Sequence, residues 1–138
     1  MSNFKSTEIT IYNQKIDENS STKNVPLGTI IKAIDKDTTN YGVGEFIYLK
    51  GVASTVLGSA VVYNDGDFST TLALPNAVGQ LAWAMAPTVA NEYGWYQIGG
   101  KAVGKVGASF VDNADCYLTS TPGTIDDADV AGDYIRRC

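Results

Sequence analysis

Short runs of alternating apolar and polar residues recur along this chain and predict a protein built from β-strands. The stretch EFIYLKGVAS, residues 45–54, is rich in aromatic and β-branched residues, and residues 29–34 form a similar run. Turn-forming residues separate such runs at intervals of roughly 8–12 residues, which gives about eight to ten short strands. We therefore predict an all-β domain, either a small β-barrel or β-tulip-like fold or a β-sandwich.

Two segments in the middle of the chain refine this prediction. In VVYNDGDFST, residues 61–70, two strand-like runs flank NDGD, so a hairpin with Asp65 and Gly66 as the turn pair is expected. In GQLAWAMA, residues 79–86, the alanines permit a single helical turn. Large residues nevertheless alternate strictly with alanines there, and this alternation favours a strand in a close-packed sheet.

The first 24 residues differ in character from the rest of the chain. They are mostly polar, and only TEITIYNQKID alternates, with Ile9 and Ile11 on one face. The following DENSSTKN is typical of a loop. We predict that residues 1–24 form an N-terminal arm or edge segment and that residues 25–138 form a single β domain.

A glycine-rich run, EYGWYQIGGKAVGKVGASF at residues 92–110, invites comparison with a phosphate-binding loop. The Walker pattern requires GxxxxGK followed by Ser or Thr at a strand-to-helix junction. Here Val106 follows the second lysine, and the context is all-β. We predict a strand whose glycines mark bends or the close approach of another backbone. A further strand at 116–120, a TPGT turn and a last strand at 134–137 follow.

Composition narrows the classes of function. The net charge is −5 and charged residues make up only 18% of the 138 residues, which suggests that surface is buried in an assembly. Nucleic-acid binding needs clustered basic residues, and only Arg136 and Arg137 are adjacent. No apolar run is long enough to span a membrane, and the N-terminus does not resemble a signal peptide, so a cytosolic setting is expected.

The chain offers little for catalysis or metal binding, so no enzyme activity, cofactor or metal is predicted. It contains no histidine, which removes the usual triads, zinc ligands and general base. Its two cysteines form no CxxC motif; Cys116 is expected to be a buried thiol and Cys138 an exposed terminal residue. Asp65 and Asp67 could act as the carboxylate pair of a carbohydrate-active enzyme, but turn chemistry explains them more simply.

Aromatic residues are the strongest candidates for a binding role. They could stack on a sugar ring or lie at a protein interface, whereas core packing is the expected role for at least two of them. The candidate interface residues are Trp83, Tyr93, Trp95, Tyr96, Phe4 and Tyr12.

Residues 42–135 resemble the capsid decoration, or cement, proteins of tailed phages. Three stretches carry the resemblance: GVGEFIYLKGVASTVLGSAVVYN, then AVGQLAWAMAPTVANEYGWYQIGGKAVGKVGASFVDNADCYLTSTPGTIDDA, and finally VAGDYIRRC. They cover about two thirds of the chain, leave residues 1–41 outside, and are structural signatures rather than a catalytic motif.

The resemblance implies a small β domain that binds the major capsid protein on the outside of an icosahedral head. It also implies homotrimers at three-fold and quasi-three-fold positions that strengthen the expanded shell, with the virion exterior as the location. Similar chains often continue with further strand after the region matching Arg137. The last strand is therefore expected to be an edge or to be completed by a neighbour. Another phage structural β-protein, such as a head-fibre base or tail component, is the alternative.

Overall fold

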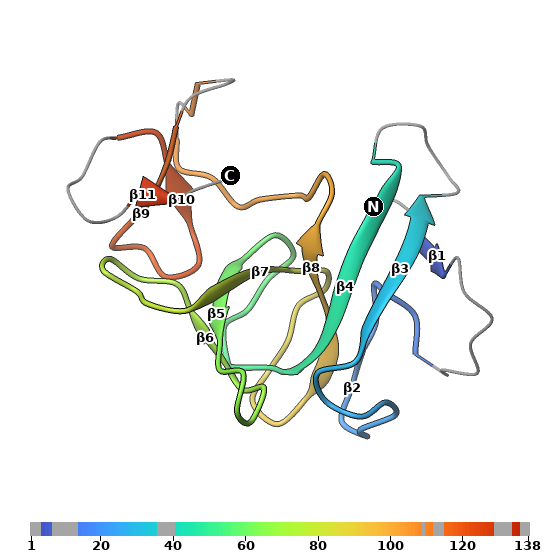
Figure 1. Ribbon diagram of the computed structural model, residues 1–138. Helices are drawn as coiled ribbons and strands as arrows, with labels where there is room; N and C mark the ends of the chain where they lie inside the picture. Colours follow the sequence, from blue (N-terminus) through green and yellow to red (C-terminus); the bar gives the residue numbers. More distant parts are fainter. Residues whose placement is uncertain are drawn as a thin grey trace.

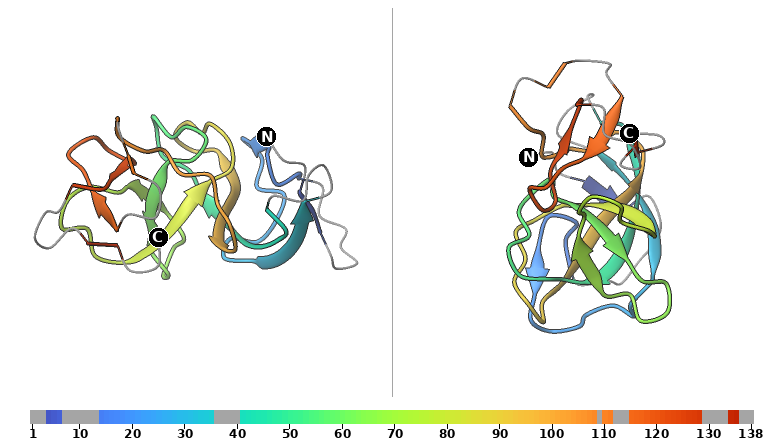
Figure 2. Two further views of the ribbon diagram at one scale, coloured as in Figure 1. Left: turned by 90° about the horizontal axis from the view of Figure 1, so that it is seen from above. Right: turned by 90° about the vertical axis from the view of Figure 1, so that its left-hand side faces the viewer.

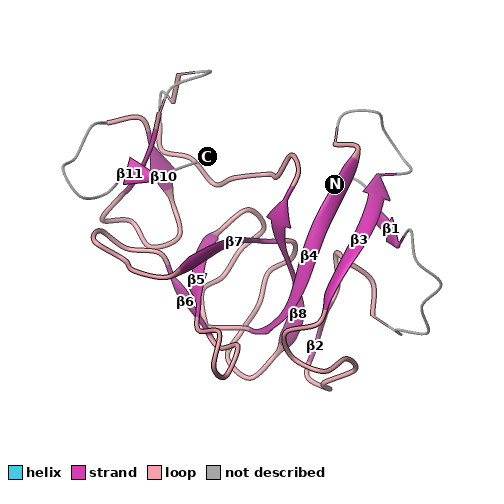
Figure 3. Ribbon diagram, in the orientation of Figure 1, coloured by secondary structure: helices cyan, strands magenta, loops and turns pink. Residues whose placement is uncertain are grey.

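The chain folds into two antiparallel β-sheets. The computed structural model describes residues 4–6, 14–35, 41–108, 110–111, 115–128 and 134–135. These residues form eleven strands and no helix (Figures 1 and 3). The all-β prediction is therefore confirmed.

The larger sheet contains eight strands and the smaller sheet three. Across the larger sheet the order is β1 (Phe4–Ser6), β3 (Ile30–Asp35), β4 (Val43–Lys50), β8 (Tyr93–Gly99), β7 (Gln80–Ala84), β5 (Ala60–Tyr63) and β6 (Thr70–Leu72), while β2 (Asn19–Ser20) also pairs with β8. The smaller sheet has the order β10 (Ile125–Asp126), β9 (Cys116–Leu118) and β11 (Tyr134–Ile135). It lies at one end of the molecule, and β1 and β3 lie at the other (Figure 2).

The larger sheet is open rather than closed into a barrel. Among the described strands, β1 and β6 are its two ends, and no strand ladder joins them. A single parallel bridge between Lys50 and Ser69 brings the end of β4 to the start of β6, but no pairing continues from it. Of the architectures expected from the sequence, a closed barrel is thus not formed by the described residues.

The two longest strands, β4 and β8, form the centre of the larger sheet. They pair antiparallel, with Phe46 opposite Gln97 and Tyr48 opposite Trp95. The register shifts between Glu45 and Phe46, which marks a β-bulge. Residues 44–53 and 94–103 have weakly similar sequences, and the strands that they contain, β4 and β8, are neighbours at the centre of one sheet.

Alternation along these strands distributes large side chains over both faces of the sheet. One face carries the cluster of Phe46, Tyr48 and Trp95, which packs against side chains from the N-terminal part of the chain. The other face carries a cluster that includes Leu49 and Tyr96. A third cluster, with Cys116, Leu118, Ile125 and Ile135, joins the smaller sheet to β5 and β7.

Several local predictions are confirmed. Strands β5 and β6 form the hairpin around NDGD, with Tyr63 opposite Thr70. The ambiguous stretch 79–86 contains strand β7, in which Ala82 and Ala84 are buried and Leu81 and Trp83 are half-buried. Strands β9 and β10 are joined by the TPGT turn, and β11 pairs only with β9 among the described strands.

The N-terminal part of the chain was expected to form an arm or edge segment, and its described residues contact the rest of the domain. Residue Gln14 is 6% exposed and Ile16 is 5% exposed, and both belong to the interior. Strand β2 pairs with β8, and β1 is an edge strand that pairs with β3. Residues 14–24 thus lie against the body, while Ile9 and Ile11 fall outside the described residues.

One prediction about cysteine is wrong. Cys116 is buried, as expected, but it is disulfide-bonded rather than a free thiol. The spacing of two cysteines without a CxxC motif says nothing about their proximity, because contacts between distant residues are decided by the fold. The sequence contains only one other cysteine, Cys138, which falls outside the described residues.

Buried phenols make the fold sensitive to alkaline pH. Burial is the main reason why the pKa of Tyr48, Tyr63 and Tyr96 is raised above the ordinary value of 10.0. The folded state therefore holds these phenol protons more tightly than the unfolded chain does. Their contribution to stability is complete below pH 10.0 and is lost as the pH rises through the folded-state pKa values.

We expect the midpoint of urea denaturation to fall steeply above that pH. Absorbance of tyrosinate, followed together with circular dichroism, should show that the last tyrosines ionise as the protein unfolds. Complete tyrosine ionisation with the fold intact would contradict this expectation.

Candidate interaction surface

Two of the aromatic residues considered for an interface lie in the core. Trp95 is 2% exposed and Tyr96 is 1% exposed. The Trp95 ring meets Tyr48 edge-on, with ring centroids 5.1 Å apart, and its Nε1–H donates to the carbonyl of Gln14. Trp95 and Tyr96 are therefore structural residues of this chain, and their side chains are not available to a partner.

The other candidate interface residues have more varied positions. Tyr93 is half-buried and stacks on Tyr48 with ring centroids 6.4 Å apart. Trp83 is half-buried and lines a cleft between the two sheets. Phe4 is described only by its backbone, which pairs with Asp35, and Tyr12 lies outside the described residues.

A different set of residues forms an uncovered part of the larger sheet. Because paired residues of neighbouring strands share a face, the pairs formed by β3 and β4 bring alternate residues of both strands together. Ile30 is 55% exposed and Val43 is 51% exposed. We call this surface the β3–β4 face, and it consists of Ile30, Lys32, Ile34, Val43 and Glu45.

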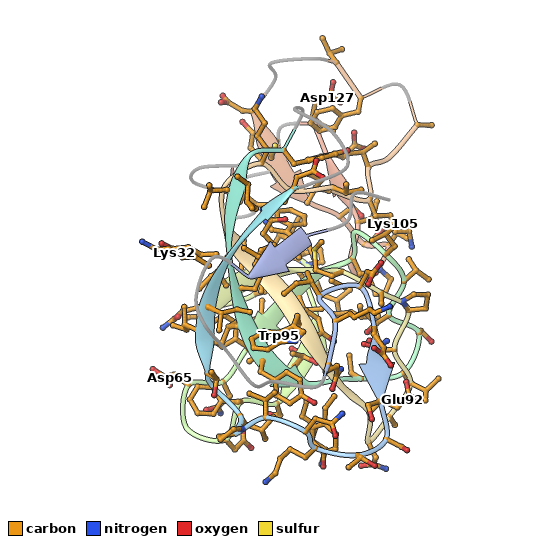
Figure 4. The ribbon with its side chains drawn as sticks, turned by 90° about the vertical axis from the view of Figure 1, so that its right-hand side faces the viewer. Lys32, Asp65, Glu92, Trp95, Lys105 and Asp127 are labelled. Carbon is orange, nitrogen blue, oxygen red and sulfur yellow. The ribbon has the colours of Figure 1, made fainter. Side chains whose placement is uncertain are left out.

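The charges on the β3–β4 face are paired. The ammonium of Lys32 lies 4.0 Å from the carboxylate of Glu45, and both side chains are well exposed. Such a solvated pair contributes little to stability, about 0–1 kcal/mol. The main effect of the Lys32–Glu45 pair is that the β3–β4 face has no net charge. Aliphatic side chains surround the pair. Figure 4 shows Lys32 pointing away from the body, whereas Trp95 lies inside it.

The side chains of Asn64 and Asp67 stabilise the turn of the NDGD hairpin. The side chain of Asn64 accepts a hydrogen bond from the N–H of Gly66, and Asp67 accepts from both the hydroxyl and the N–H of Ser69. The hydroxyl bond from Ser69 is the main reason why the pKa of Asp67 is lowered. Asp65 and Asp67 are both exposed. These contacts support the turn interpretation over a catalytic pair.

The glycine-rich run forms the end of β8 and a loop that returns to the smaller sheet. Gly100 has a φ of +85°, and a Cβ at this position would lie 2.6 Å from the carbonyl oxygen of Val43. Glycine is therefore required where the two backbones approach closely. The loop then binds the body through Lys105, whose N–H donates to the carbonyl of Gly58.

A cleft of about 830 Å³ opens beside this loop. Its lining combines aromatic, amide and aliphatic side chains with the backbone of the glycine-rich loop. Its lining residues include Tyr41, Trp83, Gln97, Lys101, Gly104 and Phe110.

Sequence reasoning missed the β3–β4 face, although the signal was present. The alternation in residues 29–34 and 43–50 places Ile30 and Val43 on a definite side of each strand. The pattern does not say whether that side is covered by another part of the chain, so it cannot identify an exposed aliphatic surface.

Comparisons of the chain with protein families, with curated proteins and with solved structures found no match. Over the described residues, no helix has the length and apolar character needed to cross a membrane. Within the same part of the chain, no three His, Cys, Asp or Glu side chains gather in a way that could hold a metal ion.

Proposed function

We propose that this protein is a capsid decoration protein of a tailed phage that acts by binding alone. The resemblance of residues 42–135 to that family supports the proposal, and the all-β fold agrees with it. The structural observation that carries it is the β3–β4 face, an exposed neutral surface on rigid strands. Its partner is the major capsid protein, on the outer surface of the expanded head.

The chemistry of the β3–β4 face suits a protein partner. Desolvating Ile30 and Val43 favours association, since each is about half exposed in the free chain. The Lys32–Glu45 pair presents a donor and an acceptor side by side, which fixes the orientation of a partner rather than adding much affinity. Homotrimers that bridge several capsid subunits would stabilise the shell by linking neighbours, without enzyme activity or a cofactor.

A single charge placed on the β3–β4 face tests this proposal. The Val43→Asp variant is expected to fold normally and to lose binding to expanded, undecorated heads, because it buries an unpaired carboxylate at the contact. Val78→Asp is the matched control, since Val78 is 93% exposed and lies on the loop between β6 and β7. Binding is measured by co-sedimentation with heads, and folding by circular dichroism.

The outcomes separate the proposal from its alternative. Normal head binding by Val43→Asp would show that this face is not the contact. Failure of the unaltered chain to bind heads would overturn the decoration role itself. Immunogold labelling on a head fibre or tail would instead favour the other class of phage structural protein.

A further inference from the structure

The cleft beside the glycine-rich loop is created by two strands that separate. Strands β7 and β8 pair only through Trp83 with Gln97 and Ala84 with Tyr96. Beyond Trp83, β7 continues along β5, whereas β8 continues along β4. The cleft lies where they part, and the loop after β8 and the smaller sheet form its other walls. Its volume of about 830 Å³ falls within the range of small-molecule sites, roughly 300–1,000 Å³.

The side-chain amide of Gln97 presents a hydrogen-bond acceptor at the cleft. Gln97 lines the cleft but is only 1% exposed. Its Nε2 donates to the carbonyl oxygens of Gly99 and Lys101, at 2.9 and 2.8 Å. Among the described residues no hydrogen bond is formed to its Oε1, and this oxygen is not one of the fully buried polar atoms without a partner, so it is open to solvent. An acceptor oxygen that is open to solvent can also accept a hydrogen bond from a ligand that carries a hydrogen to donate.

Aromatic side chains line the same cleft as Gln97, and Gly104 leaves one of them, Trp83, accessible. Trp83, Tyr41 and Phe110 line the cleft, and each is half-buried. A Cβ on Gly104 would lie 3.6 Å from Cζ3 of Trp83 and 3.8 Å from Cδ1 of Ile125. A larger residue at position 104 would therefore project over the Trp83 ring, and glycine keeps the ring accessible from this side.

From this arrangement we infer that the cleft binds a neutral sugar ring. A carboxylate carries no hydrogen at neutral pH, so it could bind the ammonium of Lys101 but could not donate to the acceptor of Gln97. A purely apolar ligand would leave that acceptor unpaired. A sugar hydroxyl donates to Oε1 of Gln97 while a second hydroxyl accepts from the ammonium of Lys101, which is the one charged side chain among the described lining residues. The apolar C–H face of the sugar packs on the aromatic rings.

The cleft lining shares no residue with the β3–β4 face, so the inference stands whether or not the decoration role is correct. Sugar binding would give a particle that carries many copies of this chain a weak, multivalent contact with glycans.

The two tryptophans provide a direct test by nuclear magnetic resonance. Glucose, galactose, mannose and N-acetylglucosamine are titrated into the ¹⁵N-labelled protein, and the two indole N–H signals are followed. We expect at least one of these sugars to shift the Trp83 signal in a saturable manner. The Trp95 signal is expected to stay in place, because its Nε1–H is buried and bonded to Gln14. Unchanged Trp83 with all four sugars would overturn the inference.

A variant at Gly104 locates the site without disturbing the fold. Because a Cβ there makes only ordinary van der Waals contacts, Gly104→Leu should fold and fill the cleft. Its affinity for the sugar is expected to fall by about tenfold or more. Ala108→Leu, an exposed change on the same loop outside the cleft lining, is the control and should bind normally. Equal sugar affinity of the Gly104→Leu and Ala108→Leu variants would also overturn the inference. So would a parallel titration in which peptides bind and the sugars do not.

Discussion

Replacing Trp95 with alanine is expected to lower the free energy of unfolding by about 3–5 kcal/mol. Trp95 is the largest fully buried side chain of the sheet and packs edge-on against Tyr48. Its removal leaves a cavity between the central strands and the N-terminal segment, and it deprives the carbonyl of Gln14 of a donor. Urea denaturation followed by circular dichroism measures the loss.

A conservative variant separates packing from hydrogen bonding at this position. Trp95→Phe keeps an aromatic ring but removes the Nε1–H donor, so it should cost clearly less than alanine. A Trp95→Ala protein that unfolds at the same urea concentration as the unaltered chain would show that Trp95 is not a core residue. A Trp95→Ala protein that is as stable as the unaltered chain but no longer self-associates would show that Trp95 lies at a subunit interface.

Replacing Gln14 with alanine is expected to cost about 2–4 kcal/mol, because it breaks a buried hydrogen-bond network. The side-chain Nε2 of Gln14 donates to the carbonyls of Glu18 and Tyr93. Its Oε1 accepts from the hydroxyl of Tyr48 and from the side chain of Asn24. Without it, the Tyr48 hydroxyl loses its acceptor inside the protein. Lys15→Ala, at the exposed neighbouring position, is the control and should change stability little.

The same network predicts the result of shortening the chain. Removing residues 1–20 takes away Gln14, Ile16 and the β2 pairing, and should destabilise the domain by at least as much as Gln14→Ala. Removing residues 1–3, which precede β1, is the comparison. A stable domain after the longer deletion would restore the view of this segment as an independent arm. Because a loss of fold also abolishes capsid binding, stability has to be measured before binding is interpreted.

Local patterns were sufficient to predict most strands. The hairpin around Asp65 and Gly66 follows from turn chemistry within a few residues, and it needs no information about the rest of the chain. The strand at 80–84 follows from the alternation of large residues with alanine, which only a sheet with one crowded face satisfies. The close approach of another backbone was expected from glycine in a strand, and it is found at Gly100, although β8 already ends at Gly99 and the rest of the run is a loop.

Predictions that depend on contacts between distant residues were less successful. The polar composition of residues 1–24 indicated an arm or edge segment, and β1 is an edge strand, but it gave no sign that Gln14 would be buried with its amide bonded to four partners. Cys116 has the expected burial but not the expected free thiol. Trp95 and Tyr96 are adjacent and point to opposite faces, yet both are buried because this part of the sheet is covered on both sides.

The sequence by itself determined the all-β class, the main strands and the hairpin turns, since these depend on side-chain periodicity and backbone preference over a few residues. Only the tertiary structure decided that the sheet stays open, which aromatic side chains are buried, and that Ile30 and Val43 remain exposed. It alone shows the cleft, because β7 and β8 separate beyond Trp83 and Gln97. Burial depends on which distant segments cover a strand, and no local pattern encodes that.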